Sequence, residues 1–131
     1  MTINEIRKKL DEINYWDCKA LDFAIQYFGD EAEIVIEIQE GLCYSIKFLL
    51  CHKVKYETDV KDRWKITEVR NMSKKQLGYY VQDITVKEHE ESDFIEVQII
   101  LDLLYVNIVC KDVLFSQFPY EMREFFWHRN E

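Results

Sequence analysis

Glycine, proline and long apolar runs are scarce in this sequence, and each shortage excludes a class of protein. Three of the 131 residues are glycine and one is proline, so flexible linkers and glycine-rich phosphate-binding loops are not expected. No apolar run reaches ~20 residues, the length that a transmembrane helix requires. The N-terminal residues lack the hydrophobic stretch of a signal peptide. We therefore expect a cytoplasmic protein that does not associate with a membrane and folds as a single domain over residues 1–131.

Recognisable catalytic and metal-binding spacings are also missing. The serines lack a G-x-S-x-G context, and the adjacent residues Cys51 and His52 would point to opposite faces of a strand. The three histidines lie far apart in the sequence, and no two cysteines form a C-x-x-C pair. We therefore expect a non-enzymatic protein without a cofactor or a metal ion. Reduced, buried thiols are expected at Cys18, Cys43, Cys51 and Cys110.

Acidic residues outnumber basic ones by 25 to 17, which gives a formal net charge of −8. Charge of this sign repels nucleic acid, which is therefore not an expected partner. Residues 53–75 depart from the average, with eight basic and four acidic residues. Because the two signs are interleaved there, we interpret this segment as an ordinary solvated loop and strand. A basic binding face is the alternative.

The N-terminus predicts an amphipathic helix. Thr2 and Glu5 have the spacing of a capping box. Apolar residues then recur at spacings of three and four, which puts them on one face of a helix. They are Ile3, Ile6, Leu10 and Ile13. This stripe predicts that the helix docks on the rest of the domain.

Alternating apolar and polar residues predict a series of strands. The expected strands cover residues 21–27, 33–39, 42–50, 78–87, 95–101 and 104–110. The first three, joined by tight turns, form an antiparallel meander, and a further short strand is expected near Trp64. Asp102 interrupts an apolar run, and we interpret it as a strand break that reaches water. A buried acid with a perturbed pKa is the alternative.

One sequence pattern occurs twice in the chain. Residues 44–54 and 105–113 each contain an alternating apolar run that reaches a cysteine, followed three residues later by a valine. Each occurrence follows another strand-like run across a short polar break. The pattern indicates a sheet-rich domain built from hairpins.

The C-terminal end is rich in aromatic residues, with four phenylalanines and a tryptophan between residues 115 and 127. Pro119 suits the start of a helix. The elements together predict a mainly β (α+β) domain, with an antiparallel meander of six to eight strands curled into a sandwich or half-barrel. The N-terminal helix would cover one face or one open edge, and a short C-terminal helix or an aromatic tail would pack on the sheet.

A charged turn separates two of the expected strands, those over residues 78–87 and 95–101. Its acidic residues are Glu88, Glu90, Glu91 and Asp93. The tip of a hairpin is exposed, so these carboxylates can remain free for a basic partner, and we take them as candidate partner-binding residues. The alternative is a solvated turn without a function.

The order of these features resembles that of known families. Trp16-Asp17 opens the sheet, a hairpin follows, and strands of similar pattern cover residues 46–54 and 106–113. Over residues 15–116, the layout looks like that of small sheet-rich, uncharacterised Bacillus-type proteins of the YxiG kind. It is also similar to that of immunity proteins of bacterial polymorphic toxin systems. The resemblance implies a cytoplasmic, non-enzymatic protein that neutralises a toxin by contact, with an acidic surface for a basic toxin domain.

A second function remains open at this point. The domain could bind a small ligand, or act as an enzyme, in the interior of the curled sheet. A deep pocket lined by convergent polar groups would favour that function. A closed core with an exposed acidic and aromatic surface would favour toxin binding.

Overall fold

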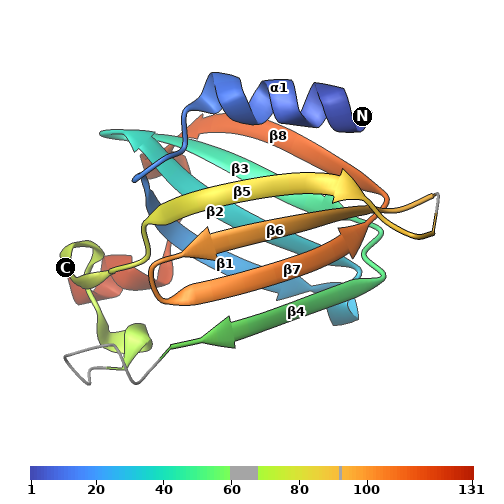
Figure 1. Cartoon of the computed structure of the whole chain (residues 1–131). Coiled ribbons are helices and arrows are strands. Elements are labelled where there is room, and N and C mark those ends of the chain that lie inside the picture. Colours follow the sequence, from blue (N-terminus) through green and yellow to red (C-terminus); the bar gives the residue numbers. More distant parts are fainter. Residues whose placement is uncertain (60–67, 92) are drawn as a thin grey trace.

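The computed structural model describes residues 1–59, 68–91 and 93–131, and it contains two four-stranded antiparallel sheets that face each other (Figure 1). The strands are β1 (Lys19–Gln26), β2 (Glu31–Gln39), β3 (Leu42–Leu49), β4 (Lys53–Thr58), β5 (Val81–Glu88), β6 (Ile95–Leu101), β7 (Leu104–Cys110) and β8 (Asp112–Pro119). The expected mainly β sandwich is confirmed, and within the described residues the sheets do not close into a barrel. The strand expected near Trp64 lies outside these residues.

Each sheet combines three consecutive strands with one strand from the other half of the chain. The first sheet has the order β1-β2-β3-β8 and the second has the order β4-β7-β6-β5. The meander expected at the start of the chain is confirmed by the pairing of β1 with β2 and of β2 with β3. The chain passes to the second sheet between β3 and β4, and it returns between β7 and β8. We call these two connections the crossings.

The two occurrences of the repeated sequence pattern contain the two crossings. β3 ends at Leu49 and β4 begins at Lys53, while β7 ends at Cys110 and β8 begins at Asp112. The expectation of continuous strands over residues 46–54 and 106–113 is therefore wrong. Both crossings are so short that the apolar runs on either side almost join in the sequence, and the pattern of apolar residues does not reveal that the chain changes sheet.

The crossings lie side by side and are joined by backbone hydrogen bonds. The N–H of His52 donates to the carbonyl of Val109 at 2.7 Å, and the N–H of Lys111 donates to the carbonyl of Leu49 at 3.1 Å. In Figure 1 both crossings are at the right-hand end of the sandwich, the end that also carries the β5–β6 turn. We call this the crossing end.

Alternate side chains of the strands fill the space between the two sheets. Ile34 and Ile46 come from the first sheet and Ile99 and Ile108 from the second, and each is at most 1% exposed. Burying a side chain of this size stabilises the fold by roughly 1.5–3 kcal/mol. Asp102, between β6 and β7, is exposed, which confirms the interpretation of a strand break.

A smaller apolar cluster lies on the outer face of the first sheet. A bulge in β1 turns Leu21 outward, where it joins Val35 of β2 under the aromatic C-terminus. Trp127 is 1% exposed, and its indole N–H donates to the carbonyl of Leu21 at 3.1 Å. The expected packing of the tail on the sheet is confirmed. The C-terminal helix is a 3-10 helix, Phe126–Asn130.

The N-terminal helix α1 (Ile3–Ile13) has the expected capping box between Thr2 and Glu5. It ends at Asn14, which adopts the left-handed conformation (φ +57°) common at helix ends. Three of the four residues of its apolar stripe are buried, and the fourth, Ile3, packs beside them.

The helix spans one open edge of the sandwich, between β5 and β8 (Figure 1). On the β5 side, the guanidinium of Arg7 donates two hydrogen bonds to the carbonyl of Val86, at 2.6 and 3.2 Å. On the β8 side, the N-terminal ammonium pairs with Asp112 at 2.9 Å. Of the two positions expected from the sequence, the edge is therefore the one that is observed.

Removal of Leu10 tests this docking. Leu10→Ala should lower the free energy of unfolding by ~2–5 kcal/mol, because it leaves a cavity under the helix. Urea denaturation followed by circular dichroism measures the change. Lys8→Ala, on the exposed side of the same helix, should stay within ~0.5 kcal/mol of the unsubstituted protein. A loss below about 1 kcal/mol for Leu10→Ala would show that the helix contributes little to the fold.

Candidate functional site

The four acidic residues expected to bind a partner lie at the turn between β5 and β6. Glu88 ends β5, and the turn carries the others. The side chains of Glu88, Glu90, Glu91 and Asp93 are all exposed. The structure thus presents the four carboxylates together at the crossing end. Their role in binding stays a prediction.

The base of this turn contacts both crossings through Phe94, the residue directly before β6. The ring of His52 lies 5.4 Å from the Phe94 ring, centroid to centroid, and the ammonium of Lys111 lies 5.4 Å from the Phe94 centroid. Within the hairpin, the N–H of Phe94 donates to the carbonyl of Glu91 at 3.0 Å. Contacts of this kind connect the residue directly before β6 to both crossings.

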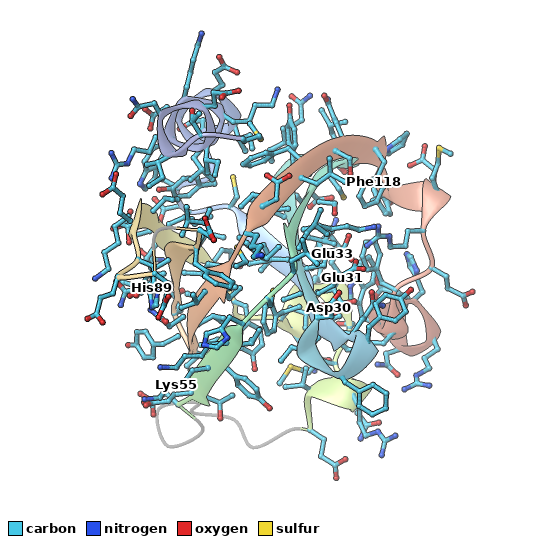
Figure 2. The ribbon with its side chains drawn as sticks, turned by 90° about the vertical axis from the view of Figure 1, so that its right-hand side faces the viewer. Asp30, Glu31, Glu33, Lys55, His89 and Phe118 are labelled. Carbon is cyan, nitrogen blue, oxygen red and sulfur yellow. The ribbon has the colours of Figure 1, made fainter. Side chains whose placement is uncertain are left out.

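A second turn lies at the same end of the molecule. It joins β1 to β2 and consists of Tyr27, Phe28 and Gly29. In Figure 2, which looks onto the crossing end, Asp30 and Glu31 lie next to this turn and His89 lies on the opposite side. A hollow of about 580 Å³ lies between this turn and residues 51–54.

The aromatic side chains of the β1–β2 turn point into solvent. Tyr27 is 69% exposed and Phe28 is fully exposed. The strand expected over residues 21–27 would place Tyr27 on its apolar face, but β1 ends at Gln26 and Tyr27 belongs to the turn. Sequence reasoning recognised the turn but missed its exposed aromatic residues. The available signal was the position of Phe28 directly before a glycine.

The backbone of the β1–β2 turn is strained. Three consecutive residues have positive φ: +54° at Tyr27, +57° at Phe28 and +93° at Gly29. Glycine adopts this left-handed region freely, but each non-glycine residue does so at a cost of roughly 1–2 kcal/mol. Strain of this kind is concentrated at functional sites in proteins.

A polar cluster lies on the outer face of the first sheet and was not expected from the sequence. Arg123 donates to both carboxylate oxygens of Glu33, at 2.9 and 3.2 Å, and the hydroxyl of Ser45 donates to the same carboxylate. Burial raises the pKa of Glu33, but the hydrogen bonds from Arg123 and Ser45 outweigh this effect and leave the pKa below its ordinary value. The cluster fastens the C-terminal segment to the sheet.

An apolar groove of about 470 Å³ lies between β1 and β4, on the edge opposite α1. Its walls include Phe23, Tyr56 and Leu104. Asp22 also lines it, and burial, together with the nearby charge of Glu33, raises the pKa of this carboxyl group. The described residues give this groove a predominantly apolar lining, whereas an active site is expected to have convergent polar groups.

Comparison with known proteins identifies the family. The family model described as immunity protein PIM7 matches residues 2–117. The chain belongs to the PIM7 immunity protein family. The match includes α1, the β1–β2 turn and the acidic β5–β6 turn, and it ends before Arg123. The expected similarity to immunity proteins is confirmed. The likeness to YxiG-type proteins finds no support in these comparisons.

The fold of this PIM7 family member also occurs in a solved structure. The crystal structure of an uncharacterized protein from Neisseria gonorrhoeae superposes with a TM-score of 0.51 at 12% sequence identity, and the alignment covers 78% of this chain and 92% of that protein. At this identity the similarity concerns the fold alone. A search of curated proteins finds no match. Among the described residues, no helix is long and apolar enough to cross a membrane.

The cysteines are four free thiols. Burial raises the pKa of Cys43 and of Cys51 to about 11 and that of Cys110 to about 12. These thiols are therefore protonated at neutral pH and poor nucleophiles. In residues 1–59, 68–91 and 93–131, no three His, Cys, Asp or Glu side chains are placed to hold a metal ion. Reduced cysteines and the absence of a metal ion stay predictions.

The thiols give a direct test. Ellman's reagent at pH 8 should label Cys43 and Cys110 at least ~100-fold more slowly in the native protein than in the denatured protein. The reason is that a pKa raised by two or more units lowers the fraction of reactive thiolate by about that factor. In denaturant all four cysteines should react at once. Fewer than four reactive thiols in denaturant, or zinc found by native mass spectrometry, would contradict the prediction.

The Glu33–Arg123 pair gives a second test. Arg123→Ala should lower the free energy of unfolding at pH 7 by about 1–2 kcal/mol, a modest value because Arg123 is partly exposed. The lowered pKa of Glu33 means that its stabilisation is complete above 4.5, the ordinary glutamate value, and is lost as the pH falls. Urea denaturation at pH 7 and pH 3.5 should therefore show that the difference between the two proteins shrinks in acid.

The control for this test is Arg129→Ala, which removes an exposed arginine from the same segment and should change stability little at either pH. A loss for Arg123→Ala that is equal at both pH values would show that the arginine acts through packing and not through Glu33.

Proposed function

We propose that the protein neutralises a toxin by binding its toxic domain directly, without catalysing a reaction. Family membership supports an immunity function. The observation that carries the contact mechanism is the crossing end, where exposed acidic residues and exposed aromatic residues lie at the same end of the sandwich. A surface that combines these two classes of side chain fits a protein partner.

The charge of the protein supports a basic partner. The net charge is −8, and four carboxylates project from the β5–β6 turn with Asp30 exposed across the same end. Complementary charge accelerates the encounter between two partners, and it disfavours binding of molecules whose charge has the same sign as that of the protein. A toxin domain with a cationic surface is therefore the partner that fits best, and the cytoplasm is the compartment that we propose for the encounter.

The structure offers less support for a ligand-binding or enzymatic function. The space between the sheets is filled by buried apolar side chains. The groove between β1 and β4 is lined predominantly by apolar groups. A catalytic pocket needs several polar groups that converge on one point. We therefore favour binding at the crossing end.

The test neutralises the acidic turn. A variant with Glu88→Gln, Glu90→Gln, Glu91→Gln and Asp93→Asn should associate with the cognate toxin domain about tenfold or more slowly at low salt, because electrostatic steering is lost. Rising salt should slow the unsubstituted protein in the same way. Stability should be nearly unchanged, since all four side chains are exposed. Stopped-flow or surface plasmon resonance measures the rates.

A matched control removes four exposed charges from the opposite end, with Asp17→Asn, Glu40→Gln, Glu121→Gln and Glu124→Gln. Its net charge equals that of the test variant, so only the position of the charge differs. Equal slowing of both variants would refute the assignment to the acidic turn. Failure of the unsubstituted protein to bind the toxin domain encoded beside its own gene would refute the proposed function itself.

A further inference from the structure

We infer that the β1–β2 turn is the aromatic anchor of the toxin-binding surface, and that Phe28 and Tyr27 insert into an apolar recess on the cationic toxin domain. This inference rests on the proposed function and names the residues that hold the partner after encounter. It gives the β1–β2 turn a function that is distinct from the function proposed for the acidic β5–β6 turn.

The first argument is that this turn combines two unfavourable features. Its two aromatic residues adopt the left-handed backbone region, which asparagine and glycine occupy far more readily. Their rings are also exposed to water, 69% for Tyr27 and completely for Phe28. Burial within this chain therefore offsets little of the backbone strain. Burial against a partner would offset it, and a large aromatic ring is the side chain that gains most from such burial.

The second argument is that the turn is held in place before any partner binds. The N–H of Asp30 donates to the carbonyl of Tyr27 at 3.1 Å, and the N–H of Cys51 donates to the carbonyl of Asp30 at 2.8 Å. Gln26 and Glu31 form the last pair of the β1–β2 ladder directly below the turn. A turn fixed at its base and to the first crossing presents its rings with little conformational freedom to lose on binding.

The third argument identifies the chemistry of the partner. Asp30 follows the turn, and His89 of the acidic β5–β6 turn lies across the crossing end from it (Figure 2). Apolar rings flanked by carboxylates match a surface in which an apolar recess is bordered by lysine or arginine. Such cations also interact favourably with the faces of aromatic rings. The same basic toxin domain that the acidic turn attracts is thus the occupant that fits these rings.

The decisive variant is Phe28→Asn, because asparagine removes the ring and tolerates positive φ. It should melt at the same temperature as the unsubstituted protein or higher. Its Kd for the cognate toxin domain should rise by about 30-fold or more, the loss typical of a hot-spot residue. The rise should come from faster dissociation, whereas loss of the acidic turn slows association. Phe28→Tyr should retain most of the affinity.

Met122→Asn is the matched control, since Met122 is an apolar residue that is 75% exposed in the C-terminal segment; its Kd should not change. If the unsubstituted protein binds and Phe28→Asn binds as tightly, the inference is wrong while the proposed function stands. A lowered melting temperature for Phe28→Asn would instead assign the ring a structural role. A dimer by analytical ultracentrifugation that Phe28→Asn dissociates, with toxin binding unchanged, would show that a second copy is the occupant.

Discussion

The hydrogen bonds between the two crossings are the constraint on which the rest of this structure depends. They join His52 to Val109 and Lys111 to Leu49, so each half of the chain is tied to the other at the point where it changes sheet. β4 can then align on β7, and β8 on β3. The same bonds bring the β1–β2 turn and the β5–β6 turn to one end of the molecule. Both parts of the proposed binding surface owe their positions to this arrangement.

Much of the fold could be predicted because its signals are local. The spacing of Ile6, Leu10 and Ile13 follows the period of 3.6 residues that indicates a helix, and the alternation of apolar and polar residues indicates strands. The change of sheet could not be predicted, because only residues 50–52 and residue 111 separate the strands that flank the two crossings. Periodicity tells which side of a strand faces the core, but it does not tell which strand lies beside it. That information is in the pairing of residues about 50 positions or more apart, such as Lys53 with Val109.

Some features of the candidate site could likewise be predicted from the sequence, and others could not. The exposure of Glu88 and its acidic neighbours follows from their place in a hairpin turn. The exposure of Phe28 does not, because an aromatic residue near a strand is more often part of a core. The partnership of Glu33 with Arg123, 90 residues later in the chain, has no local signal at all. Glu33 looks in the sequence like any outward-facing acid on a strand.

Each half of the chain supplies one strand to the sheet of the other half, and this arrangement has a consequence for biosynthesis. β4 takes its ladder partner from β7, and β3 takes one of its two partners from β8. The first half therefore leaves the ribosome with edges whose partners have not yet been translated. Sheet formation through such distant pairs is slow compared with local helix formation. During synthesis, those edges therefore stay without their native partners until β7 and β8 have been made.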